Sequence, residues 1–105
     1  MDPMIRSFFL GFIKIHILYH AEEEPVYGLW LIDELKRHGY EISPGTLYPI
    51  FHSLESDGLL RSRKQIVRGK VRKYYRTTTK GKNTLRQARE KVQKLLNEII
   101  EGTHQ

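Results

Sequence analysis

The chain has 105 residues, of which 39% are hydrophobic and 29% are charged, and its formal net charge is +6. This size and composition predict one small globular domain near the lower limit for a self-sufficient core, so assembly with a second copy would help to stabilise it. The absence of cysteine excludes disulfide bonds and thiolate metal sites and is compatible with a reducing cytoplasm.

The first predicted helix covers residues 4–20, and apolar side chains surround it on nearly every side. Its most apolar part, residues 8–19, contains Lys14 and His16 and is much shorter than the ~20 residues that span a bilayer. We therefore expect a cytoplasmic protein with no export signal and no membrane association. A helix that is apolar all round must be buried all round, so we expect part of it to face a second subunit.

Two further helices are predicted next. The first covers residues 27–38 and ends at Gly39, a residue suited to a C-terminal cap. The second is indicated by four apolar residues at the i, i+3, i+4, i+7 spacing of a buried stripe, and it ends at Gly58. These four residues are Leu47, Ile50, Phe51 and Leu54.

Pro49 determines where we expect this third helix to begin. In a helix interior its missing N–H costs about 3 kcal/mol. We therefore predict that Thr46 is the N-cap and that the helix covers residues 46–57, since the first N–H groups of a helix have no intrahelical partner. Hydroxyl and free N–H groups at such an N-terminus suit phosphate. The outward face of the first turns would present Tyr48, Pro49, His52 and Ser53.

The positive charge lies in one segment. Residues 1–57 carry a net charge of −5, residues 58–89 carry +12 without any Asp or Glu, and residues 90–105 carry −1. Two β-branched and aromatic runs, residues 59–67 and 71–77, predict a hairpin that turns at Arg68-Gly69-Lys70. A solvated charged ribbon is the alternative, but the lack of acidic residues favours a surface that binds a polyanion.

Residues 79–101 form the last predicted helix, whose apolar residues recur at alternating spacings of three and four over about two heptads. This stripe could pack only on its own domain, but the apolar first helix also needs a partner surface. We therefore expect the first and last helices to form a two-fold dimer interface. Its expected residues are Phe8, Phe9, Phe12, Leu85, Val92, Leu95, Leu96 and Ile99.

The predicted order of three helices, a basic hairpin and a final helix is that of a winged helix-turn-helix. The fold class is mainly α with a small β-hairpin (α+β), and the third helix occupies the position that enters a major groove. Residues 1–78 would form the DNA-binding domain and residues 79–105 the dimerisation helix, as one compact unit. The wing residues expected to contact DNA are Arg61, Arg63, Lys64, Arg68, Lys70, Arg72 and Lys73.

Several motifs then carry a family resemblance. Tyr27-Gly28, residues 41–49 (EISPGTLYP), residues 54–59 (LESDGL) and residues 72–76 (RKYYR) closely resemble the PadR family of bacterial and archaeal transcriptional regulators. The resemblance implies a dimeric DNA-binding repressor of the smaller subfamily with one C-terminal helix, often released from its operator by a small molecule. It also implies that Ser43, Thr46, Tyr48 and Pro49 face DNA, with Arg72, Lys73 and Tyr75 in the wing.

Two departures from the family pattern concern packing: Leu29-Trp30 replaces the more usual Tyr-Glu, and Thr77 stands where an apolar residue is common. Some family members stack planar drugs on a tryptophan of the C-terminal helix. This chain has none there, and we expect its single tryptophan, Trp30, to belong to the core. A small-molecule effector therefore has no identified site.

Other functions find little support in the sequence. There is neither a Gly-rich phosphate loop nor a set of nucleophile, base and orienting group, so we expect no enzymatic activity and no cofactor. His16 and His20 stand four residues apart, but spacing alone is weak evidence, and we expect no metal site. The predicted function is a homodimeric repressor that binds double-stranded DNA at a pseudo-palindromic operator. The alternatives are a protein-interaction module that binds an acidic partner, and an RNA-binding protein.

Overall fold

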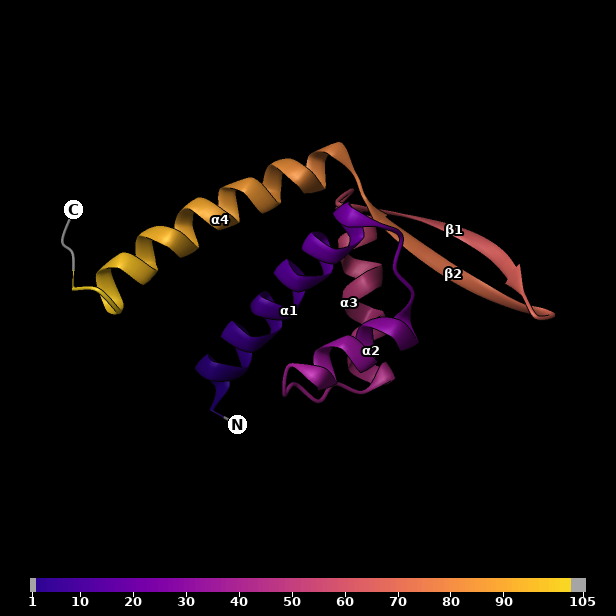
Figure 1. Cartoon of the computed structure of the whole chain (residues 1–105), viewed down its shortest axis with the longest axis horizontal. Helices are drawn as coiled ribbons and strands as arrows, with labels where there is room; N and C mark the ends of the chain where they lie inside the picture. The colour runs from indigo at the N-terminus through magenta and orange to yellow at the C-terminus, as the bar shows by residue number, and fades with distance from the viewer. Residues whose placement is uncertain (1, 103–105) are drawn as a thin grey trace.

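Residues 2–102, the part of the chain that the computed structural model describes, form four helices and one two-stranded antiparallel sheet (Figure 1). The order of the elements confirms the predicted fold class. Their bounds are α1 Pro3–Glu23, α2 Gly28–Arg37, α3 Pro44–Ser56, β1 Leu60–Val67, β2 Lys70–Thr77 and α4 Thr79–Ile99.

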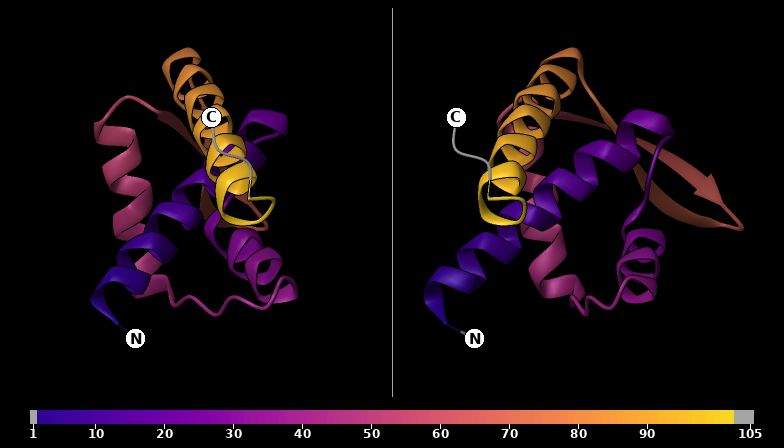
Figure 2. Two further views of the ribbon diagram at one scale, coloured as in Figure 1. Left: turned by 90° about the vertical axis from the view of Figure 1, so that its left-hand side faces the viewer. Right: turned by 60° about the vertical axis from the view of Figure 1, so that its left-hand side comes forward.

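The core lies where α1, α2, α3, the base of the hairpin and the start of α4 meet (Figures 1 and 2). The predicted stripe of α3 is buried, with Leu47 and Phe51 fully enclosed. Trp30 packs against the edge of this core with its ring perpendicular to that of His20, as the sequence predicts for a core side chain. Thr77 is also buried, and its hydroxyl donates a hydrogen bond to the Leu18 carbonyl over 2.8 Å, which satisfies the polar group at this position.

The start of α3 differs from the prediction. Ser43, not Thr46, is the N-cap, because the Ser43 Oγ accepts a hydrogen bond from the Thr46 N–H over 3.3 Å. Pro44 takes the first helical position, where its fixed φ is favourable. Pro49 therefore lies inside the helix and leaves the Gly45 carbonyl without its usual donor, but Gly45 is exposed, so water can hydrogen-bond this carbonyl.

The hairpin strands pair in antiparallel register over all eight residues of each strand. The turn at Arg68 and Gly69 has positive φ at both positions, 52° and 77°, as two-residue hairpin loops of type I′ require. The tip of the hairpin projects away from the helices (Figure 1). The predicted basic wing is therefore a long two-stranded ribbon.

Tyr75 at the base of this ribbon belongs to the core. Its side chain is only 4% exposed, and its ring stacks on that of Phe51 with the centroids 4.2 Å apart. Its backbone exchanges two hydrogen bonds with Val26, of 2.9 and 2.7 Å. The expectation that Tyr75 contacts DNA is therefore wrong, because this side chain packs inward between the hairpin and α3.

Only the beginning of α4 joins the core. Thr78 caps the helix by accepting a hydrogen bond from the Gly81 N–H over 3.0 Å, and Leu85 is 2% exposed. Leu85 is therefore a core residue of its own protomer, which corrects its assignment to the dimer interface. From residue 86 to residue 99 all side chains are exposed apart from those of Ala88 and Asn97. As a whole, α4 contacts α1 more than any other element, but its C-terminal half extends away from α1 (Figure 1).

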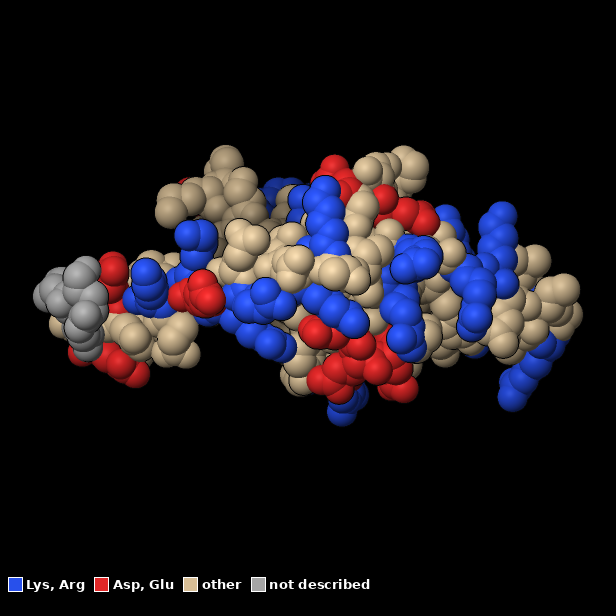
Figure 3. All heavy atoms as spheres, turned by 90° about the horizontal axis from the view of Figure 1, so that it is seen from above, with Lys and Arg blue, Asp and Glu red and all other residues tan. Residues whose placement is uncertain are grey.

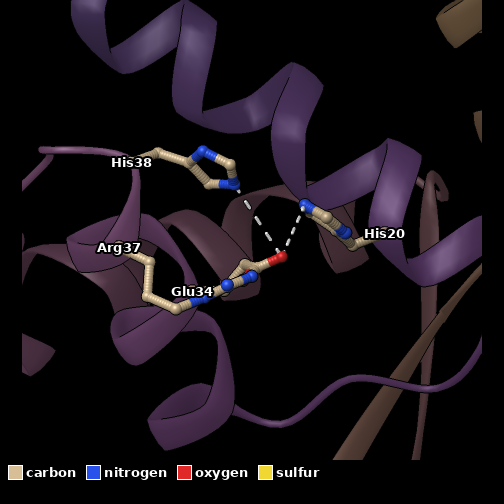
Figure 4. Close-up of polar contacts among 4 residues, drawn as sticks. All are labelled: His20, Glu34, Arg37 and His38. Atoms are coloured by element: carbon tan, nitrogen blue, oxygen red, sulfur yellow. Dashed lines mark hydrogen bonds and ion pairs between the residues drawn. The ribbon is translucent and has the colours of Figure 1, made fainter.

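A polar cluster around Glu34 joins α1 to α2 (Figure 4). The Glu34 carboxylate pairs with Arg37 and lies 3.9 Å from Nε2 of both His20 and His38. The ring of His16 lies 6.0 Å from that of His20 and 6.3 Å from that of His38. Partial burial, and then the two neighbouring histidines, lower the pKa of His16 below its ordinary value. The hydrogen bond from Arg37 lowers the pKa of Glu34.

The described residues contain neither a metal site nor a membrane-spanning helix. Within residues 2–102, no three His or acidic side chains converge closely enough to hold a metal ion. In that same part of the chain, none of the helices is both long and apolar enough to cross a membrane.

Candidate nucleic-acid interface

The outer face of α3 carries the predicted DNA-facing residues. Tyr48, Pro49 and His52 are exposed, and His52 lies four residues after Tyr48 and three after Pro49, so it neighbours both on the side of the helix away from the buried stripe. Ser43 and Thr46 lie at the N-terminus, where the Ser43 hydroxyl also donates a hydrogen bond to Thr46 Oγ1 over 3.3 Å. The face therefore combines an aromatic ring, an imidazole and two hydroxyls at the positive end of the helix dipole.

Basic side chains cover the hairpin. The cationic residues Arg61, Arg63, Lys64, Arg68 and Lys70 are all exposed. In Figure 3 blue side chains extend along this face and over its right-hand end, which the hairpin forms, whereas the red carboxylates lie over the middle and the opposite end. On this face the end formed by the hairpin thus carries basic side chains without acidic ones.

The strand register places like charges opposite one another. Arg61 pairs with Arg76, and Lys64 pairs with Lys73. Like charges at directly opposed positions destabilise a sheet, so the ribbon forms in spite of this repulsion. A bound polyanion would neutralise these pairs, whereas a ribbon that served only for solubility would gain nothing from them.

Lys73 is held against α3 by a carboxylate that the sequence analysis missed. Its Nζ lies 3.6 Å from Oε1 of Glu55, and the Ser62 hydroxyl donates a hydrogen bond to the same carboxylate. This hydrogen bond, which outweighs the effect of burial, and then the charge of Lys73 lower the pKa of Glu55. Although burial opposes it, the proximity of Tyr75 and Glu55 raises the pKa of Lys73. The pair therefore joins the hairpin to α3.

Arg72 is held by an aromatic side chain that lies just before α2. Its guanidinium carbon lies 4.0 Å from the centroid of the Tyr27 ring, a cation–π contact. The Tyr27 ring also meets that of Tyr74 edge-on, with centroids 5.4 Å apart. A hydrogen bond to the Tyr74 hydroxyl, 3.5 Å long and so at the outer limit, raises the pKa of Arg72. Arg72 is therefore a permanently charged group in a fixed position.

An open groove brings several of these residues together. It has a volume of about 630 Å³ and lies between the start of α2, the start of α3 and the wing. Tyr48 and the basic residues Arg68, Lys70, Arg72 and Lys73 all line it. Arg61 and Arg63 line a different hollow of the hairpin, with Arg76 and Tyr74. The predicted site residues thus divide into one group around the start of α3 and another at a separate hollow along the ribbon.

A second surface, at the other end of the molecule, is almost wholly apolar. A groove of about 460 Å³ runs between α1 and α4. Several of its side chains are strongly exposed, including Phe8 at 66% and Ile99 at 68%. Phe12, by contrast, also packs on Tyr40 of its own protomer, with ring centroids 5.2 Å apart, as Phe9 does at 5.8 Å. The groove is lined by Ser7, Phe8, Gly11, Phe12, Ile15, Val92, Leu95, Leu96, Ile99 and Ile100.

Known proteins resemble this chain along most of its length. The profile of the transcriptional regulator PadR-like family matches residues 17–87. The Transcriptional regulator Rv3488 of Mycobacterium tuberculosis is 45% identical over 98 residues, which are 93% of this chain and 92% of that protein. Among solved structures, a PadR-like transcription factor from Bacteroides fragilis superimposes with a TM-score of 0.80 at 31% identity, covering 96% of this chain and 98% of that one. A PadR family transcriptional regulator from Eggerthella lenta gives a TM-score of 0.76 at 35% identity, with coverage of 93% and 90%.

Proposed function

The chain belongs to the PadR-like family of transcriptional regulators, and from this premise we propose that it is a homodimeric repressor that binds a pseudo-palindromic operator in double-stranded DNA. In this proposal α3 enters the major groove, and the wing lies along the adjacent backbone or minor groove. Binding there would block transcription. The protein is a regulator and not an enzyme.

One observation carries the proposal most directly. An exposed face of α3 that bears Tyr48, Pro49 and His52 lies beside a basic ribbon whose register opposes like charges. The ribbon supplies the sequence-independent attraction to phosphates, and side chains of the helix can reach base edges. An acidic protein partner would also neutralise the ribbon. An acidic partner bound to the ribbon would not explain why α3 exposes Tyr48, Pro49 and His52 beside the ribbon.

The homodimer is proposed from the apolar groove between α1 and α4. Val92 and Leu95 are each 51% exposed, on a part of α4 whose outer face has no cover within the described protomer. Exposed apolar surface of this extent favours association. A second copy is the occupant we propose, because a pseudo-palindromic operator requires two recognition helices, which enter successive major grooves about 34 Å apart.

The experiment that tests the proposal uses fluorescence anisotropy of the purified protein on DNA. The DNA upstream of the protein's own gene is compared with scrambled DNA of equal length across a salt series. We expect a preference for the native fragment that survives physiological salt. Equal, salt-labile binding to both fragments would contradict sequence-specific recognition of this operator candidate and favour a general polyanion surface.

Two substitutions sharpen this test. Tyr48→Ala and Thr46→Ala are expected to weaken binding to the native fragment by roughly 10- to 100-fold, the discrimination of about 1–3 kcal/mol that a good base contact supplies. Binding to scrambled DNA should change much less, and the dimer should stay intact. An equal loss on both DNA molecules would show that these residues contact only phosphates.

A further inference from the structure

Residues 26–28 lie where the hairpin, α2 and α3 meet. Val26 is tied to β2 by its two backbone hydrogen bonds to Tyr75. Tyr27 follows it and contacts the wing, and Gly28, the first residue of α2, contacts the recognition helix. Two neighbouring residues thus touch both of the elements proposed to bind DNA.

Gly28 is buried, and it is needed for space rather than for backbone freedom. The backbone φ of Gly28 is not positive, so another residue could adopt this backbone conformation. A Cβ placed on Gly28 would lie 2.5 Å from Oη, 2.8 Å from Cζ and 3.0 Å from Cε1 of Tyr48. These distances lie at or below the closest approach that Cβ atoms normally make. Even alanine at position 28 must therefore displace the Tyr48 phenol.

The Tyr48 ring is held at two points. At one side it contacts Phe51 on its own helix, with ring centroids 6.3 Å apart, and at the other its phenol end rests on Gly28. The ring nevertheless remains 47% exposed and forms part of the groove wall beside Lys70 and Arg72. Gly28 therefore helps to decide which part of the Tyr48 ring solvent, or DNA, can reach.

Tyr27 has the corresponding relation to the wing. Its ring holds the Arg72 guanidinium at 4.0 Å and packs against Tyr74, which comes from the same strand. A long side chain that is already ordered loses less conformational entropy when it binds a ligand. The contact therefore prepares Arg72 at a fixed place beside the recognition helix.

We propose that Tyr27-Gly28 is a positioning pair: Gly28 sets the orientation of the Tyr48 ring, and Tyr27 sets the position of Arg72, so that recognition helix and wing meet DNA as one rigid unit. Neither residue contacts DNA in this arrangement; both act through the side chains that do. The inference rests on the proposed function, because it assigns Tyr48 and Arg72 to the DNA surface.

A double-mutant cycle tests the part that concerns Gly28. The affinities of the full chain, Gly28→Ala, Tyr48→Ala and the double variant are measured by anisotropy on the native upstream fragment, with circular dichroism and gel filtration to verify fold and dimer. We expect Gly28→Ala to weaken binding about 10-fold, and the double variant to bind no more weakly than Tyr48→Ala. Such non-additivity is what an effect exerted through the Tyr48 ring requires.

The outcomes distinguish a failure of the role proposed for Gly28 from a failure of the DNA-binding role proposed for α3. If Gly28→Ala lowers affinity by the same factor with and without Tyr48, Gly28 does not act through Tyr48 and the inference is wrong. If Tyr48→Ala binds the native fragment like the unmodified chain, the proposed role of the recognition helix fails instead.

Tyr27 provides a second test that does not depend on the folding of the Gly28 variant. Tyr27→Leu keeps an apolar side chain but removes the ring beneath Arg72, and we expect a loss of DNA affinity of roughly 3- to 5-fold that disappears when Arg72→Ala is also present. Tyr40→Leu is the matched control, since Tyr40 is another half-buried tyrosine but packs on Phe9 and Phe12 rather than on the wing. With an intact dimer verified by gel filtration, it should not change the affinity. A loss with Tyr27→Leu that persists in the Arg72→Ala background would overturn the positioning role.

Discussion

The two ends of the molecule expose surfaces that isolated folded domains normally avoid, and they do so for opposite reasons. At one end the hairpin holds like charges in opposed register. At the other end the groove between α1 and α4 leaves apolar side chains in water. The hairpin tip and the C-terminal half of α4 lie far apart, on opposite sides of the helical core (Figure 1). The charged end requires a counter-charge, whereas the apolar end requires burial.

This difference indicates that the two proposed partners bind at separate ends: DNA at the basic hairpin and a second copy of the chain at the apolar groove. Attraction between the ribbon and phosphates depends on released counterions and therefore weakens with salt. Burial of an apolar groove is favourable because it removes apolar surface from water, and salt does not weaken this effect by screening. The two ends can therefore be perturbed separately: salt should weaken DNA binding without dissociating the dimer, and a substitution in the apolar groove should weaken the dimer without changing the charge of the ribbon.

Salt should produce the largest effect, and only at the basic end. If six or more phosphates are neutralised, DNA affinity should fall on the order of 10³-fold between 50 and 200 mM salt. The dimer should persist over the same range, as sedimentation velocity would show. A DNA affinity that is flat across the series would contradict the role given to the basic hairpin.

A charge in the apolar groove should produce the next largest effect. Leu95→Glu makes anionic an exposed apolar side chain that we place in the dimer interface. The two-fold dimer contains this substitution in both protomers, so the free energy of association decreases by twice the loss at one site. With about 1.5 kcal/mol for each leucine, the dimer should weaken roughly 10²-fold. Mass photometry or sedimentation at a series of concentrations measures the dissociation constant of the dimer.

Gln93→Glu is the control: it introduces the same carboxylate on the exposed surface of the same helix and should leave the dimer unchanged. Equal dimer strength in both variants would remove the groove from the interface.

A smaller effect should appear when the pH is lowered. Partial burial, and then the neighbouring His20 and His38, lower the pKa of His16 in the folded protein, and Glu34 partly compensates. The unfolded chain therefore takes up a proton first, so folding stability should decrease as the pH falls from the ordinary value of 6.5 to the lowered folded value. His16→Gln should reduce this dependence in urea unfolding measured between pH 8 and pH 5. An unchanged slope would show that His16 does not contribute to it.

Local signals explain what the sequence predicted correctly. The stripe of α3 follows from its spacing, and the cap at Gly39 and the turn at Gly69 follow from glycines that adopt positive φ. The basic ribbon follows from a segment that lacks acidic residues altogether. These features depend on neighbours in the sequence, so no tertiary information was needed.

The errors and omissions all involve tertiary contacts or a choice between two similar local signals. Thr46 and Ser43 are both good caps, and a proline inside a helix is tolerated here because Gly45 faces water. Periodicity places Leu85 on the apolar stripe of α4 without telling a protomer core from a dimer interface. The contact of Gly28 with Tyr48 joins residues from two different helices, so only the structure gives the physical reason for glycine at this position.

The spacing of the two operator halves tests the central claim most directly, because it depends on both ends of the molecule at once. Once the upstream fragment is mapped by footprinting, its affinity is compared with that of a version carrying five extra base pairs at the centre. Five base pairs turn one half-site about half a helical turn away from the other, so a two-fold dimer should lose at least 10-fold in affinity. Equal affinity for the two fragments would contradict a dimer that presents both recognition helices to one face of the DNA.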